Sequence, residues 1–177
     1  MILVAGVGYM HLSDLSFGPM MVERLQTMDW PEGVRVEDFS YGPMAILEWF
    51  EESPGKRFDR AIFIGAEERG REPGTLSAYE WLAELPPPEE IQERVANALV
   101  GVMSLENLLF IAQHFEVLPV ETFVVELEPV DLEWGMELSP LGERRMEKAI
   151  AWIRREVHSG VKHVGNGRRE EVPKRNE

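Results

Sequence analysis

Residues 1–19 read MILVAGVGYMHLSDLSFGP, and this stretch decides the fold class of the chain. Its first part, residues 2–5, is a short uncharged apolar run that ends at a Gly-Val-Gly turn, which is typical of a strand buried inside a sheet. A polar loop over residues 9–16 follows, and helical periodicity begins after it. A strand, a glycine-rich turn and a helix form the first half of a βαβ unit, where ligands usually bind beyond the carboxyl end of the strand. We therefore expect functional chemistry between Gly8 and Leu15.

The glycines of this turn do not make a dinucleotide-binding fingerprint. The pattern G-x-G-x-x-G requires a glycine at the position where this chain has His11. The helix also begins too late after the turn for its N-terminus to receive a pyrophosphate. The sequence therefore argues against nucleotide binding here.

Strand-like runs alternate with segments of helical periodicity along the rest of the chain. The expected strands lie near residues 2–6, 34–39, 60–65, 75–81 and 122–127. The run at 75–81 is the weakest and is expected at an edge, whereas the apolar runs require helices on both faces of the sheet. We expect a three-layer α/β/α fold with a twisted, mostly parallel sheet of about five strands.

Two serines are expected to begin helices. Ser104 precedes an apolar helical stripe, and Ser139 is followed by Pro140, so that the pair supplies an N-cap and a favoured first helical residue. The last helix carries an apolar stripe that ends near residue 157, and the charged tail beyond it has no apolar period. We expect one domain over residues 1–158 and a flexible tail over residues 159–177.

Composition excludes several classes of protein. The chain has 177 residues, a formal net charge of −14 and no cysteine. Such an acidic surface repels nucleic acid and anionic lipid, so neither is an expected partner. Disulfides, a thiol nucleophile and a thiolate metal site are all impossible without cysteine. No apolar run has the length of a signal sequence or a membrane span, so we expect a cytoplasmic protein.

Several side chains near the expected site are candidates for catalysis. His11 lies in the same loop as Asp14, and a histidine–carboxylate pair can act as acid and base or supply metal ligands. Glu67 and Glu68 follow the strand at 60–65 and could approach Asp14 to form paired carboxylates. A solvated loop histidine and a charged surface loop are the plainer interpretations, and they are the ones we favour. The nucleophile elbow G-x-S-x-G is absent from the sequence.

The opening stretch resembles the [NiFe]-hydrogenase maturation endopeptidases. These proteins begin with an apolar strand, the pattern G-x-G-N-x-L-x-x-D-(D/E)-x-x-G and a helix. The matching text here is GVGYMHLSDLSFG at residues 6–18, which keeps the glycines, Leu12 and Asp14. Tyr9 replaces the asparagine of the pattern, and Leu15 replaces its acidic residue, which the family uses as a metal ligand. The resemblance therefore implies a family member without its first ligand.

The resemblance also locates the two other ligand positions. The family places an aspartate where this chain has Gly65, shortly before a P-G-T that recurs here at residues 73–75. It places a histidine before a helix of the form L-x-(D/N)-x-L, which corresponds to Gly101 ahead of residues 105–109. No histidine occurs between residues 11 and 114, so the missing ligand does not depend on the alignment. The resemblance covers roughly residues 1–157.

The family trims a C-terminal extension from the large subunit of a nickel–iron hydrogenase, using nickel in the substrate for recognition. For this chain the resemblance implies two functions: a non-proteolytic binding or assembly factor for a hydrogenase-type large subunit, or an active peptidase with a rearranged site made by His11, Asp14 and Glu67. A small-molecule hydrolase on the same fold is a third possibility. We expect no bound metal or cofactor. The expected binding cleft, a neutral-to-apolar groove rimmed by residues 9–11 and 67–72, is formed by Gly8, Tyr9, Met10, His11, Asp14, Leu15, Gly65 and Gly101.

Overall fold

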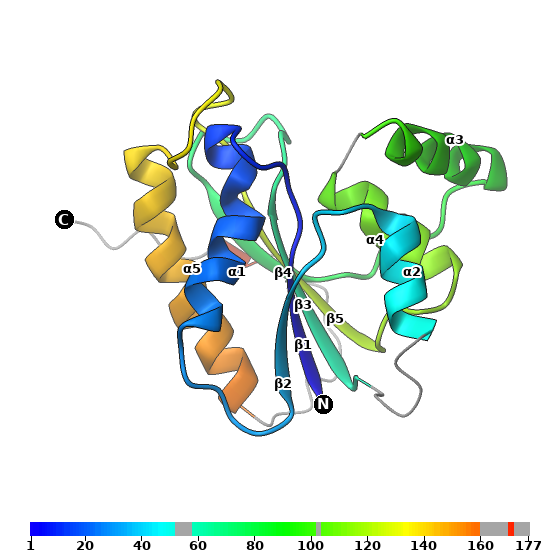
Figure 1. Cartoon of the computed structure of the whole chain (residues 1–177), viewed down its shortest axis with the longest axis horizontal. Helices are drawn as coiled ribbons and strands as arrows, with labels where there is room; N and C mark the ends of the chain where they lie inside the picture. Colours follow the sequence, from blue (N-terminus) through cyan, green and yellow to red (C-terminus); the bar gives the residue numbers. More distant parts are fainter. Residues whose placement is uncertain (52–57, 102–103, 160–169, 172–177) are drawn as a thin grey trace.

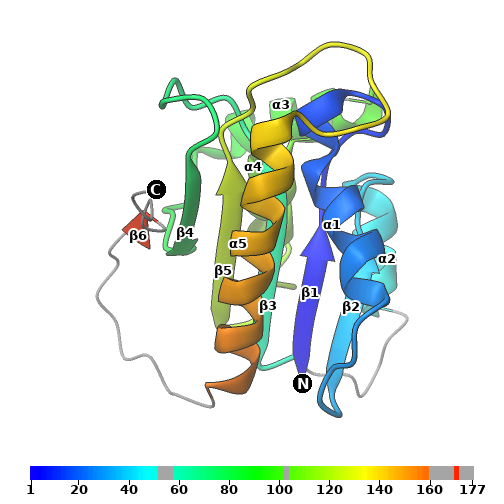
Figure 2. The ribbon, with the colours of Figure 1, turned by 90° about the vertical axis from the view of Figure 1, so that its left-hand side faces the viewer.

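The computed structural model describes residues 1–51, 58–101, 104–159 and 170–171, which fold around one central sheet (Figures 1 and 2). The strands follow the spatial order β2-β1-β3-β5-β4-β6. Their bounds are Ile2–Gly6 (β1), Val34–Asp38 (β2), Arg60–Ala66 (β3), Leu76–Glu80 (β4), Glu121–Leu127 (β5) and Glu170–Glu171 (β6). The three-layer α/β/α architecture and the five expected strands are therefore confirmed.

The centre of the sheet is parallel. β1 pairs in parallel with β2 on one side and β3 on the other, so that Val4 lies between Val36 and Ile62. β3 pairs in parallel with β5, whereas β4 runs antiparallel to β5. The two-residue β6 pairs with the outer side of β4. β6 is therefore the edge strand, and β4, which was expected at the edge, is the second strand from it.

Helices cover both faces of the sheet. α1 (Phe17–Gln26) and α5 (Pro140–His158) pack on one face, and α2 (Pro43–Glu51), α3 (Pro88–Leu99) and α4 (Leu105–His114) lie on the other (Figure 1). The strand side chains divide between two cores as the pleat requires. Val4, Ile62 and Val125 are buried under α1 and α5, whereas Leu3 and Phe63 are buried under α2 and α4. Both faces of the central strands are thus closed to water.

The helix caps expected from the sequence are present. The hydroxyl of Ser104 accepts a hydrogen bond from the backbone N–H of Asn107, and that of Ser139 accepts one from Gly142. Pro140 is the first residue of α5. The loop between β1 and α1 differs from expectation, because its second half forms a short 3-10 helix, η1, over Ser13–Ser16.

The glycines of the opening motif allow the end of β1 and the start of α1 to meet closely. A Cβ on Gly18 would lie 2.2 Å from the carbonyl oxygen of Val7, and one on Gly6 would lie 2.3 Å from the carbonyl oxygen of Gly18. No side chain fits at either position. The motif therefore fixes how closely α1 approaches the end of β1.

The expectations for the C-terminal tail fall largely outside the described residues. Of residues 159–177, the structure describes Ser159 and the two residues of β6. Among the described helices, none combines the length and the apolar character needed to cross a bilayer. The cytoplasmic location and the domain boundary at residue 158 remain predictions.

Candidate functional site

The expected site lies where the parallel strands end. The β1–α1 loop (residues 7–16), the β3–β4 loop (residues 67–75) and the β5–α5 loop (residues 128–139) all leave the sheet at this end, which is the upper end in Figures 1 and 2. The end of α3 and the start of α4 lie at the same end (Figure 1). The topology therefore gathers the loops that carry Asp14, Glu67 and Gly101.

Asp14 lies inside the protein, with none of its surface exposed. Its Oδ1 accepts a hydrogen bond from the Ser139 N–H at 2.8 Å. Its Oδ2 accepts bonds from the Ser139 hydroxyl at 2.9 Å and from the N–H groups of Val130 and Asp131 at 2.8 and 3.2 Å. Ser139 is the N-cap of α5, so the negative charge also faces the positive end of a helix. Asp14 thereby ties the β1–α1 loop to the start of α5.

His11 does not act together with Asp14. It is exposed and adopts a left-handed backbone conformation, with φ of 65°. Its carbonyl oxygen accepts a hydrogen bond from the Gly135 N–H at 3.1 Å. Within the described residues, no hydrogen bond or ion pair joins the side chain of His11 to Asp14 or Glu67. The plainer interpretation, a solvated loop histidine, fits this geometry better than an acid–base pair.

Glu67 faces the opposite layer from Asp14. Its Oε1 accepts a hydrogen bond from the backbone N–H of Glu106 at 3.1 Å, in the first turn of α4. Burial raises the pKa of the Glu67 carboxyl above its ordinary value. The carboxylates of Asp14 and Glu67 each bind the N-terminus of a different helix, and those helices lie on different faces of the sheet. The structure therefore does not bring the three candidate catalytic residues together.

A network of buried and half-buried charges joins the β3–β4 loop to β5. Arg71 donates to Glu126 at 2.7 Å and to Glu128 at 2.9 Å, and Arg69 donates to Glu126 at 3.0 Å. Arg69 also reaches Glu106 at 2.6 Å, which attaches the loop to the first turn of α4. Only 1% of Glu126 and 5% of Glu128 are exposed. Arg69 and Arg71 are therefore half-buried and paired, whereas Glu68 of the same loop is exposed.

Hydrogen bonds favour the charged forms of Glu128 and Arg69 in this network. Burial alone would raise the pKa of Glu128, but hydrogen bonds from Arg71 and from the N–H groups of Arg69 and Gly70 outweigh it and lower that pKa. For Arg69, burial opposes the charge, yet bonds to Glu126 and Glu106 raise its pKa well above the usual range. Both arginines are paired, so they offer no free anion site.

The three positions where the resemblance of the sequence places metal ligands carry no donor side chain. Leu15, in η1, is half-buried, and its carbonyl oxygen accepts a hydrogen bond from the Tyr9 N–H at 3.1 Å. Gly101 lies after α3 with φ of 92° and nothing within 4 Å of where a Cβ would be. At Gly65, by contrast, a Cβ would lie 2.9 Å from the carbonyl oxygen of Val7 and 3.1 Å from a Leu105 side-chain carbon. A side chain at position 65 would require backbone or helix α4 to move.

The remaining residues of the expected cleft lie beside these positions. Gly8 is buried, and a Cβ on it would lie 2.4 Å from the carbonyl oxygen of Leu15. Tyr9 is half-buried, and 47% of Met10 is exposed. A groove formed by these residues remains a prediction. In the part of the chain that the structure describes, no three His, Asp or Glu side chains are grouped so that they could hold a metal ion.

Sequence reasoning missed the partners of the buried carboxylates. Ser139 is 125 residues away from Asp14, so no local pattern links them. The sequence holds one signal of the charge network, because glutamates at positions 126 and 128 follow the apolar run at residues 123–125. A buried glutamate requires a cation, and the arginines of the neighbouring loop are its nearest source.

The fold defined here is that of the hydrogenase maturation peptidases. The hydrogenase 2 maturation peptidase of a Thaumarchaeota archaeon is 28% identical, with a TM-score of 0.60 over 89% of this chain and 97% of that one. HycI, a [NiFe] hydrogenase maturation protease of Thermococcus kodakarensis KOD1, is 19% identical, with a TM-score of 0.65 over 90% and 92% of the two chains. The endopeptidase HybD of E. coli is 23% identical, with a TM-score of 0.65 over 90% and 93%.

Sequence comparison alone does not find these proteins. Neither the protein-family models nor the curated protein sequences give a match to the chain. The resemblance expected from the opening motif is therefore confirmed by structure, over nine-tenths of the chain in the T. kodakarensis and E. coli cases.

Proposed function

We propose that this protein binds the large subunit of a nickel–iron hydrogenase as a non-proteolytic maturation or assembly factor. The solved structures that share its fold are named as hydrogenase maturation peptidases, which supports a hydrogenase-type partner. The proposal differs from a maturation peptidase in one respect. This protein recognises the subunit through its surface and not through side-chain ligands to the nickel.

The packing around Gly65 is the observation that carries the proposal. A donor at this position would have to enter a space that the Val7 carbonyl and Leu105 already fill. The Val7 carbonyl would have to shift and Leu105 of α4 would have to give way before position 65 could carry a ligand side chain. Leu15 and Gly101 supply no nitrogen or oxygen side-chain donor either, and a nickel site needs several that converge.

The roles of the remaining carboxylates support the same conclusion. Asp14 accepts four hydrogen bonds from inside the protein, and Glu67 binds the start of α4. A rearranged peptidase would need at least one of these carboxylates free to position a water molecule or polarise a carbonyl. The observed geometry commits both to the architecture of the loops, so a binding role accounts for the site better than hydrolysis.

The direct test compares a nickel-loaded large subunit with the same subunit prepared without nickel. Each would carry its C-terminal extension and be titrated with the purified protein by isothermal calorimetry. The proposal predicts equal dissociation constants for the two forms. Loss of one metal contact typically changes affinity by about 10- to 100-fold. A preference of that size for the nickel-loaded form, or no binding of either form, would contradict the proposal.

A further inference from the structure

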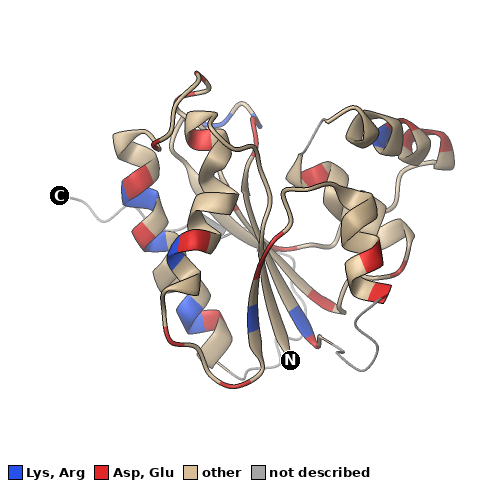
Figure 3. Cartoon of the chain, in the orientation of Figure 1, with Lys and Arg blue, Asp and Glu red and all other residues tan. Residues whose placement is uncertain are grey.

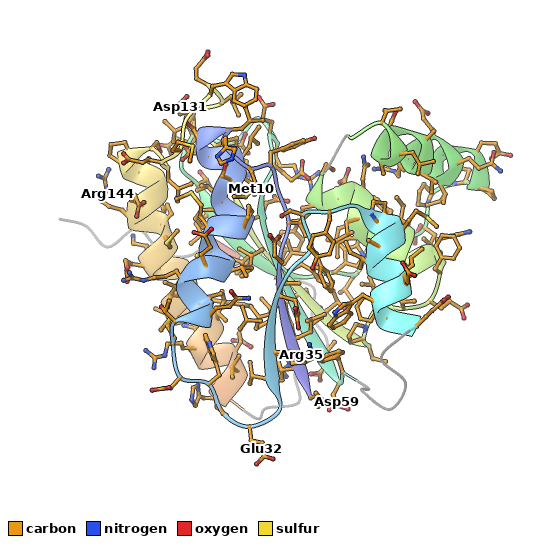
Figure 4. The ribbon with its side chains drawn as sticks, viewed as in Figure 1. Met10, Glu32, Arg35, Asp59, Asp131 and Arg144 are labelled. Carbon is orange, nitrogen blue, oxygen red and sulfur yellow. The ribbon has the colours of Figure 1, made fainter. Side chains whose placement is uncertain are left out.

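The β5–α5 loop presents apolar side chains to solvent in an unusual number. Within five residues, 41% of Leu132, 82% of Trp134 and 72% of Met136 are exposed. We call these three residues the apolar ridge. The loop stands out at the end of the molecule where the parallel strands finish, and it arches toward the β1–α1 loop (Figures 1 and 2). Met10, 47% exposed, lies at the same end (Figure 4).

The backbone of this loop is held on both sides of Trp134. The two N–H groups at Val130 and Asp131 donate to the buried carboxylate of Asp14. Beyond Trp134, the N–H of Gly135 donates to the His11 carbonyl, and its own carbonyl accepts from the Ser13 N–H at 3.3 Å. Trp134 is therefore displayed on a fixed support. Fixing a binding loop in advance reduces the entropy lost on association.

The charges around the ridge define what it can bind. Residues 129–138 contain Asp131, Glu133 and Glu137 and no lysine or arginine. Figure 3 shows acidic and no basic positions on this loop. An apolar ridge with an acidic border fits an apolar cavity bordered by lysine and arginine. A second copy of this chain, nucleic acid and anionic lipid all meet like charge here.

We infer that the apolar ridge is the docking surface for a protein with a basic, apolar-lined cavity, and that Trp134 is its anchor. Tryptophan is strongly enriched among the residues that dominate binding energy at interfaces. The inference rests on the proposed function, because it assigns this cavity to the hydrogenase-type large subunit. It adds the surface and the residue that make the contact.

The test measures binding of the purified large subunit, still carrying its extension, to the wild-type protein and to matched variants. Trp134→Ala is expected to weaken binding by about 30-fold or more. The pair Glu133→Lys and Glu137→Lys is expected to weaken it about tenfold and to reduce its dependence on salt. The controls lie at the opposite end of the molecule. Val120→Ala removes an apolar side chain that is 98% exposed, and Asp29→Lys with Glu32→Lys reverses two exposed charges.

Three results would overturn the inference. If the wild type binds and Trp134→Ala binds equally well, the ridge is not the interface, although the proposed function stands. If the wild type does not bind the large subunit at all, both the proposed function and this assignment fail. If the wild type floats with phosphatidylcholine vesicles and Trp134→Ala does not, the ridge binds a bilayer and not a protein. Thermal unfolding of each variant shows that the fold is intact.

Discussion

Asp14 and Ser139 form two hydrogen bonds across the end of the sheet, at 2.8 and 2.9 Å, with the serine donating through both its N–H and its hydroxyl. The hydroxyl also accepts a bond from the Gly142 N–H, so its proton is directed at the carboxylate. The pair joins the loop after the first strand to the first turn of the last helix. The same carboxylate holds Val130 and Asp131, which start the loop that carries Trp134.

Removing the Asp14 carboxylate should therefore destabilise the whole domain. Asp14→Ala leaves several buried donors without an acceptor, and we expect a loss of about 3–5 kcal/mol in the free energy of unfolding. For a chain of this size the midpoint of thermal unfolding would fall by about 6–20 °C. Asp131→Asn is the control, because that side chain accepts a local bond from the Glu133 N–H, two residues away in the chain. A change below about 1 kcal/mol in Asp14→Ala would contradict this role.

The packing at Gly65 leads to a second prediction. Gly65→Ala should lower the free energy of unfolding by about 1–3 kcal/mol, because the added methyl group is packed too tightly against Val7 and Leu105. Gly65→Asp should lower it further, because this substitution also buries a charge. Gly70→Ala is the matched control. Its added methyl group meets nothing within 4 Å, so its left-handed backbone alone costs about 1 kcal/mol. Denaturant titration measures all three, and a neutral Gly65→Asp would show that the ligand position is open.

Glu67→Gln should change how stability depends on pH. Because burial raises the pKa of Glu67, the folded state binds its proton more tightly than the unfolded state. Stability therefore falls as pH rises from the ordinary glutamate value of about 4.3 through the higher native value. Glutamine keeps an acceptor for the Glu106 N–H but has no proton to lose. We expect the variant to unfold a few degrees above the wild type at about pH 8 and to match it at about pH 4. A lower midpoint than the wild type at both pH values would contradict this assignment.

Arg71→Met tests the charge network from the basic side. The substitution removes a positive charge that pairs with the buried carboxylates of Glu126 and Glu128. Removing one partner of a buried ion pair typically lowers the free energy of unfolding by about 3–5 kcal/mol. Arg71 helps to lower the pKa of Glu128 in the folded protein. The stability that this pairing adds is therefore complete above the pKa of Glu128 in the unfolded chain, and it is lost as pH falls through the lower pKa of the folded state. The difference in the free energy of unfolding between this variant and the wild type should become smaller at acid pH. A difference that is independent of pH would assign the cost to packing.

The elements that the sequence predicts are those fixed by local patterns. The apolar run after Met1 became β1 because both of its faces are covered, and Ser104 and Ser139 cap helices because their hydroxyls need only the next turn of backbone. The roles of Asp14 and Glu67 depend on which layer each carboxylate faces, and on partners that lie 125 and 39 residues away in the chain. No local signal carries that information.

The central claim is that this protein binds the large subunit and does not cleave it. The measurement incubates purified protein with a nickel-loaded, C-terminally extended large subunit from the same organism and follows the intact mass over hours. A hydrogenase maturation endopeptidase with its own precursor serves as the positive control. We predict a complex in which the extension stays attached. Specific release of the extension by the purified protein would contradict the account.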